Sequence, residues 1–330
     1  MKATLDIVPR VTVHPDSINL YSEVIWSPRN PYSRKTEHLL KSNKHYGGKV
    51  SDQTRRKVAK GINYLLFIAN SYSLPASSHG KQYNFKIAFI TLTLPSKQVH
   101  SDNEIKEKCL NQFLIELSSV YKVSHYVWRA EKQANGNIHF HLLVNKFIPW
   151  SQVRDRWNRI TNKLGYVDRY RDEMRRFHSS GFNVRQDLLR NWEYKKQVKA
   201  YQVGKAQDWA SPNSTDIHAL HRINKVSAYL AKYCTKDEEE NVVNGRIWGC
   251  STSLSNIKGG STVADNEIKD EINKLLVDKS IRVYRGDYFT VCYISVHDLL
   301  QRNCEHLYNL FSTFMLEHFK YHCPPYMAFN

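Results

Sequence analysis

The 330-residue chain lacks several features that mark common protein classes. Its six cysteines are irregularly spaced and form no Cys-x-x-Cys pair, which argues against a disulfide scaffold and against standard zinc modules. It shows no secretory signal and no apolar stretch long enough to span a membrane. We therefore expect a soluble, cytoplasmic protein without disulfides and without a membrane partner.

Two further absences narrow the functional classes. The pattern Gly-x-x-x-x-Gly-Lys-Ser/Thr does not occur, so a built-in helicase of the P-loop type is excluded. Acidic residues are scarce relative to basic ones, because 31 Asp and Glu oppose 48 Lys and Arg, for a formal net charge of +17. Such an excess of positive charge indicates a polyanionic partner.

Length and local patterns predict three regions. We expect an N-terminal, partly helical basic region over 1–80, a central domain over 81–255 and a C-terminal α+β unit over 265–330. Residues 251–264 contain a Gly-Gly-Ser sequence and are typical of a linker. The domain boundaries are expected to fall at such irregular stretches, because few contacts cross them.

The terminal regions carry ordinary secondary-structure signals. Alternating apolar residues predict a short strand over 7–13, and a cap at Ser51 predicts a helix that continues to Ile68. Apolar spacing then predicts a helix, a hairpin and a long helix, over 267–278, 281–294 and 296–319. Five residues there invite a zinc site but match no standard finger spacing: Cys304, His306, His318, His322 and Cys323. We expect no zinc at these residues.

The most informative segment is Ile138–Val144, in which two histidines flank one apolar residue inside a strand-like run. Strand side chains alternate, so His139 and His141 share one face of the strand. Imidazoles placed in this way can reach one divalent cation. The ordinary alternative is a pair of histidines on a half-buried sheet face, so the neighbouring residues decide between the two.

An upstream strand-like segment, His125–Glu131, is joined to the first by a loop with a strong Asn-Gly turn signal. Parity tests whether Glu131 can join the histidines. A two-residue loop would place Glu131 opposite Phe140, on the wrong face, whereas a three-residue loop with one left-handed residue would place it opposite His141. We predict the odd-length loop or an equivalent bulge, with Glu131 as the third ligand.

A second constellation lies in Lys225–Lys236, which contains no Gly or Pro and predicts a helix. Tyr229 and Tyr233 are one turn apart, and Lys232 lies on nearly the same side, so the three form one edge. The alternative is that the tyrosines are core aromatics of an amphipathic helix. A metal with a phenol pair and a lysine suits attack of a tyrosinate on a phosphodiester.

At this point the chain resembles the HUH endonucleases that initiate rolling-circle replication, in the two-tyrosine branch that includes initiators of small single-stranded DNA phages. Three motifs occur in the family's order: the strand Phe89–Leu94, the His139-Phe140-His141 triplet, and Tyr229-x-Ala-Lys-Tyr233. The segment Arg246-x-Trp-Gly-x-Ser251 follows at a familiar distance. The resemblance covers roughly residues 82 to 255.

The resemblance implies an α+β fold, with a central antiparallel β-sheet of the RRM or ferredoxin-like kind flanked by helices, and with N- and C-terminal additions. It implies that Glu131, His139 and His141 bind Mg²⁺ or Mn²⁺, and that Tyr229, Tyr233 and Lys232 carry the strand transfer. Its expected partners are single-stranded or hairpin origin DNA and, in a bacterial host cell, a host helicase and polymerase.

Between the two motifs, a basic and aromatic insertion around 150–206 suits contact with DNA, because cations neutralise phosphates while aromatic faces stack unpaired bases. The residues expected to touch DNA are Trp157, Arg169, Arg171, Arg175 and Arg176. Three alternatives stay open. The insertion can be ordinary surface helices with solvated cations, the enzyme can be a transposase or mobilisation nuclease, and the chain can be a non-catalytic nucleic-acid-binding protein.

Overall fold

The computed structural model describes most of the chain. The described residues are 4–27, 51–69, 72–73, 84–85, 87–190, 192–219, 242–255 and 257–323. The predicted tyrosine helix over 225–236 lies outside them. Within the described part, every helix is too short or too polar to cross a lipid bilayer.

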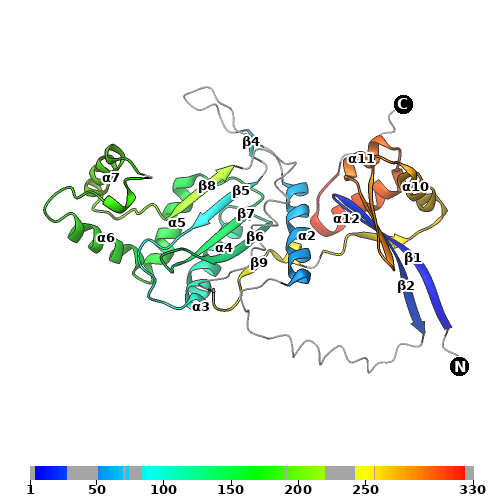
Figure 1. Cartoon of the computed structure of the whole chain (residues 1–330), viewed down its shortest axis with the longest axis horizontal. Helices are drawn as coiled ribbons and strands as arrows, with labels where there is room; N and C mark the ends of the chain where they lie inside the picture. The colour runs from blue at the N-terminus through cyan, green and yellow to red at the C-terminus, as the bar shows by residue number, and fades with distance from the viewer. Residues whose placement is uncertain are drawn as a thin grey trace. The chain divides into compact units, whose positions relative to one another are not determined.

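The chain divides into two compact units (Figure 1). We call the first the terminal unit; it comprises Met1–Lys44, Lys60–Ile68 and Thr252–Asn330. We call the second the central unit; it comprises His45–Ala59 and Ala69–Ser251. This division differs from the expected one, in which the N-terminal region 1–80 and the C-terminal unit 265–330 are separate additions.

The terminal unit is built on a five-stranded antiparallel sheet of order β10-β1-β2-β12-β11. Its strands are β1 (Thr4–His14), β2 (Ser17–Ser27), β10 (Gly260–Val263), β11 (Arg282–Arg285) and β12 (Phe289–Tyr293). The two ends of the chain therefore share one sheet, because β1 pairs with β10 and β2 pairs with β12. The expected linker over 251–264 is wrong in this respect, since it contains α9 (Thr252–Ser255) and β10.

Helices complete the terminal unit. They are α10 (Asn266–Val277), α11 (Val296–Gln301), α12 (Glu305–Phe319) and the second half of α2 (Asp52–Ile68). Tyr64 of α2 is fully buried, and its ring stacks on Phe319 of α12 at 5.5 Å between centroids. The single long helix expected over 296–319 is broken, because Asn303 adopts a left-handed φ of 52° between α11 and α12.

The central unit holds a second antiparallel sheet, of order β8-β5-β7-β6-β9. Its strands are β5 (Ala88–Leu92), β6 (Tyr126–Lys132), β7 (Ile138–Val144), β8 (Thr215–Ala219) and β9 (Trp248–Cys250). The first four form a β-α-β-β-α-β unit of ferredoxin-like order, with β9 added beside β6. Two short strands, β3 (Tyr72–Ser73) and β4 (Asn84–Phe85), pair separately. The predicted α+β fold is confirmed.

Both helical crossovers of the central unit cover the same face of its sheet, as right-handed connections require. The first contains α3 (Asp102–Ile105), a π-helical turn (Lys106–Leu110) and α4 (Asn111–Ser119). The second contains α5 (Trp150–Asn162), α6 (Tyr166–Phe177), a short 3₁₀ turn (Gln186–Leu188) and α7 (Tyr194–Ala206). Alternate strand residues such as Ile90, Phe140 and Leu142 form the core against them. The other face of each strand is left for polar side chains.

Trp157 belongs to this core and not to a DNA-binding surface. Its side chain is fully buried, and its indole N–H donates to the backbone carbonyl of Thr93 at 2.6 Å. The ring meets Phe113 and Phe140 edge to face. The expectation that Trp157 stacks on DNA bases is therefore wrong, because no face of the indole is open to a ligand.

We predict that Trp157→Ala lowers the free energy of unfolding by about 3–5 kcal/mol, through lost packing and an unsatisfied carbonyl. The matched control is Trp150→Ala in the same helix, where the side chain is 40% exposed and a loss below about 1.5 kcal/mol is expected. Urea denaturation followed by circular dichroism measures both. Equal losses in the two variants would contradict the burial of Trp157.

Candidate metal centre

The turn between β6 and β7 sets the register of the site. The backbone N–H of Gln133 donates to Asn137 and that of Gly136 donates to Gln133, each at 2.8 Å, which closes a three-residue loop. Gly136 has a φ of +81°, the left-handed conformation expected for a bulge of this type. The predicted odd-length loop is confirmed. Its position differs from the prediction by two residues, so Glu131 lies opposite His139 and not opposite His141.

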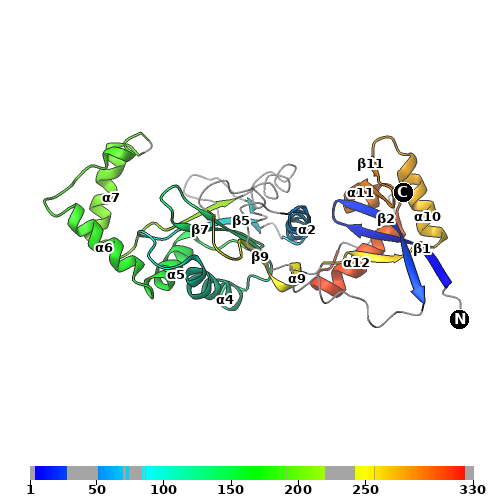
Figure 2. The same ribbon diagram turned by 60° about the horizontal axis from the view of Figure 1, so that its bottom comes forward.

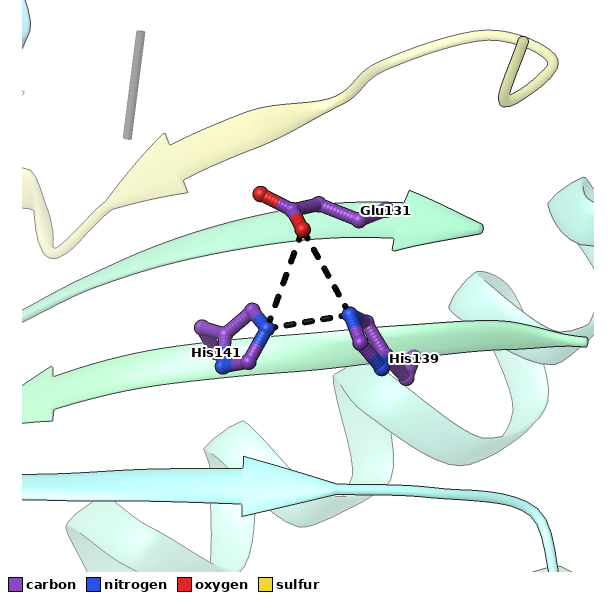
Figure 3. A group of neighbouring side chains, drawn as sticks. All are labelled: Glu131, His139 and His141. Carbon is purple, nitrogen blue, oxygen red and sulfur yellow. Dashed lines mark hydrogen bonds and ion pairs between the residues drawn. The ribbon is translucent and has the colours of Figure 1, made fainter. Parts of the chain in front are cut away.

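A shift of two residues keeps every side chain on its face, so the three predicted ligands still meet (Figure 3). The Nε2 atoms of His139 and His141 lie 3.0 Å apart. Oε2 of Glu131 lies 3.6 Å from Nε2 of His139 and 3.9 Å from Nε2 of His141. Three lone-pair donors thus converge on one point beside the sheet.

Neighbouring side chains hold the three donors in place. Oγ1 of Thr91 on β5 lies 3.1 Å from Nδ1 of His141, within hydrogen-bond distance, and the Phe89 ring stacks on the His141 ring at 5.2 Å. The Arg129 side chain is fully buried, and its Nε donates to Oε1 of Glu131 at 3.0 Å. This bond directs the other carboxylate oxygen toward the histidines.

Burial and charge prepare the donors for a cation. Burial, followed by the neighbouring His139, lowers the pKa of His141 to about 4, so this imidazole is neutral at pH 7. Burial tends to raise the pKa of Glu131, but hydrogen bonding to His139 and the charges of His141 and Arg129 outweigh it, and the net pKa is lowered. Both groups are therefore deprotonated at neutral pH, as metal ligation requires.

The donor set fits a divalent cation. Donors that each lie about 2.1 Å from one ion are about 3.0–3.5 Å apart, close to the spacing of the triad. Nδ1 of His139 is buried and has no hydrogen-bond partner among the described residues, so its ring is oriented by the strand alone. No second group of three potential donors comes together in the part of the chain that the structure describes. The cysteines and histidines of α12 and its ends accordingly form no zinc cluster.

The Arg246-x-Trp-Gly-x-Ser251 segment has a structural role that the sequence did not reveal. It leads into β9, which pairs with β6 so that Trp248 lies opposite Arg129. A Cβ on Gly249 would lie 2.6 Å from the indole nitrogen of Trp128, so only glycine fits. Buried Lys106 donates to the carbonyls of Asn244 and Arg246 and thereby anchors this segment to the π-helical turn.

Buried Asp102 reinforces the same anchor. It accepts from the backbone N–H of Asn244 at 3.0 Å and from Lys132 at 2.6 Å. Burial tends to raise its pKa, but these hydrogen bonds and the one from Gln98 lower it overall. Sequence reasoning missed Asp102 and Lys106, because a charged residue at the start of a helix is usually solvated. Arg129 was also missed, although it lies two residues from Glu131 and so on the same strand face.

The remaining predicted site residues are spread over two parts of the chain. Tyr229, Lys232 and Tyr233 lie outside the described residues. The four predicted DNA-binding arginines belong to α6: Arg169, Arg171, Arg175 and Arg176. Arg175 and Arg176 are exposed, and the other two are partly buried. Arg175 forms an ion pair with Asp208, and Arg169 lies over the Tyr166 ring at 4.6 Å.

Comparison with known families gives one match. Residues 87–238, just under half of the chain, match a family of replication-associated proteins of the ORF2 type. The matched region contains the metal triad and the positions of both predicted tyrosines. It supports a replication-associated protein that acts as a rolling-circle replication initiator and binds DNA. No curated protein and no solved structure is significantly similar to the chain.

We predict that Thr91→Val weakens Mn²⁺ binding about tenfold, because the hydroxyl that orients His141 is lost. Thr93→Val is the matched control, since Thr93 lies two residues further along and its hydroxyl donates to the carbonyl of Ser214. Titration of Mn²⁺ followed by electron paramagnetic resonance measures both affinities. Identical affinities in the two variants would contradict the orienting role of Thr91.

The metal-free protein should lose stability as the pH falls from 6.5 toward 4. The folded-state pKa of His141 is lowered from 6.5 to about 4, so in this window the unfolded chain takes up a proton that the folded site refuses. We expect a loss of about 1–3 kcal/mol from this residue. In EDTA, His141→Gln should flatten the pH dependence of urea unfolding, whereas the surface variant His322→Gln should keep it. A slope that His141→Gln leaves unchanged would contradict the argument.

Proposed function

We propose that this protein is a replication initiator endonuclease that nicks single-stranded DNA at its origin by tyrosine attack. It would remain attached through a 5′-phosphotyrosine bond and later rejoin the strands in rolling-circle replication. One observation carries the proposal: Glu131, His139 and His141 converge on the sheet face opposite α4 and α5, within residues similar to a replication-associated family.

The triad would hold Mg²⁺ or Mn²⁺, with two imidazole ligands favouring Mn²⁺. When bound, such a cation supplies the positive charge that polarises a scissile phosphate. Glu131 contributes the negative charge of the ligand set, and Arg129 holds its carboxylate in one orientation. Phe89 and Thr91 fix the His141 ring, so the ligands need little rearrangement when the ion enters.

Tyr229 is the proposed first nucleophile. Its phenol gives up a proton, its oxygen bonds to phosphorus, and the bond from phosphorus to the 3′ oxygen breaks, so that oxygen takes a proton and becomes a free hydroxyl. One phosphodiester replaces another, and the reverse step can rejoin the ends without another energy source. A phenol normally titrates near pH 10, so the cation or Lys232 has to favour the phenolate.

Tyr233, one helical turn further along the predicted helix, would attack after a round of synthesis and release a circle while the next start is held. Exposed Arg175 and Arg176 would contact the phosphates of single-stranded or hairpin origin DNA. Host helicase and polymerase would separate and copy the strands. The same chemistry at an element end would make the protein a transposase or mobilisation nuclease, and the choice of substrate separates the two.

We predict a covalent protein–DNA adduct that migrates as a shifted band on a denaturing gel. Purified protein is mixed with labelled single-stranded circular DNA of its own replicon in Mn²⁺ or EDTA. Wild type in Mn²⁺ should give the adduct; EDTA and His141→Ala should reduce it by at least about 100-fold, since the polarising charge is lost. The variant Tyr229→Phe should lose the first adduct, and Tyr233→Phe should retain it.

Tyr288→Phe, at an exposed tyrosine between β11 and β12, is the control and should match wild type. Tight binding without an adduct on the protein's own replicon would instead favour a non-catalytic DNA-binding protein. Cleavage that persists in His141→Ala would remove the metal role. Cleavage of element ends in preference to an origin would favour the transposase or mobilisation nuclease.

A further inference from the structure

The helices between β7 and β8 enclose a pocket that the proposed strand transfer does not use. Its volume is about 600 Å³, within the range of about 300–1,000 Å³ common for ligand sites. Residues of α5, α6, α7 and the loop before β8 line it. Figures 1 and 2 show α6 and α7 extending from the side of the central sheet where α5 and β8 lie.

Aromatic rings form the wall of the pocket. The His178 ring lies between Phe182 and Trp209, nearly parallel to both, with centroid distances of 6.0 Å and 5.8 Å. Nδ1 of His178 accepts from the backbone N–H of Asn183 at 3.1 Å, which fixes the plane of the ring. Tyr201 lies 5.4 Å from Phe182 and closes the cluster. The wall therefore presents flat, ordered faces.

Two tryptophans at the pocket leave much of their surface in water. Trp150 is 40% exposed and Trp192 is 37% exposed. The indole N–H of Trp150 donates to the carbonyl of Thr215 on β8 at 2.9 Å, so the ring is held at the sheet edge. Exposed indoles held in fixed positions are typical of sites that cover them with a flat ligand.

The charges at the pocket have one sign. Four cations line it, Arg154, Arg185, Lys196 and Lys199, and no carboxylate does. Arg154, Arg185 and Lys196 make exposed ion pairs with neighbouring acidic residues, which contribute little and can be exchanged for a phosphate. Lys199 is exposed and makes no ion pair with a described residue. A ligand with a flat ring and negative charge fits this combination.

We propose that the pocket binds one unpaired nucleotide of the DNA strand, its base against the tryptophans and its phosphate at Lys199. The inference rests on the proposed function, since it names how the strand to be nicked is gripped. A base within a duplex is stacked on both faces and cannot reach an aromatic wall, so the site discriminates single strands from duplex.

Binding of labelled origin oligonucleotides, measured by fluorescence anisotropy in EDTA to prevent cleavage, tests the pocket. Trp192→Ala and Lys199→Ala should each raise the Kd for single-stranded DNA about tenfold. The matched controls lie in the same helix region but do not line the pocket: Tyr194→Ala, 57% exposed, and Lys195→Ala. Both controls should remain within about twofold of wild type.

A scan of single abasic sites through the oligonucleotide identifies the bound base. One position should weaken wild-type binding and have no further effect in Trp192→Ala, because both changes remove the same stack. Equal Kd values for lining and control variants, an abasic scan without such a position, or equal effects on duplex DNA would overturn the proposal. The adduct gel at saturating DNA reports separately: an intact adduct with no pocket effect removes the pocket alone, and a pocket effect without wild-type adduct removes the nickase alone.

Discussion

The pairing of β6 with β7 is the constraint on which the site depends. Successive strand side chains point to opposite faces, so one register sends Phe140 and Ala130 into the core and sends His139, His141 and Glu131 to the other face. The left-handed Gly136 closes the turn at the one parity that achieves both. Core burial and ligand convergence are therefore selected together, and the burial free energy of the core holds the ligands in place.

The covered face and the polar face of the central sheet follow from the order of its elements. Both crossovers lie on one side, so the opposite side can carry buried Arg129, the triad and Thr91 without competing for the apolar core. Asp216 on β8 pairs in register with Thr91 and extends this polar row to the sheet edge. Asp102 and Lys106 then fasten the segment leading into β9, which returns the chain to the other edge of the sheet.

Sequence reasoning succeeded where a local period or turn determines structure. The strands of the hairpin, the odd loop and the identity of Glu131, His139 and His141 followed from alternation and an Asn-Gly turn. It failed where distant segments decide: nothing local indicates that Gly260–Val263 pairs with β1, or that Trp157 faces the core and not solvent. An amphipathic helix rich in arginine and tryptophan reads the same in both cases, because which face is buried depends on the sheet it packs against.

The shared sheet of the terminal unit sets an order of events during synthesis. The β1–β2 hairpin leaves the ribosome early, but β10 and β12, which pair with its two outer edges, follow more than two hundred residues later. At roughly 5–20 residues per second, these edges stay open for about 10–50 s. The central unit is complete before then. A hairpin with two free edges is prone to pair with other chains, so the yield of native protein depends on how quickly the C-terminal strands arrive.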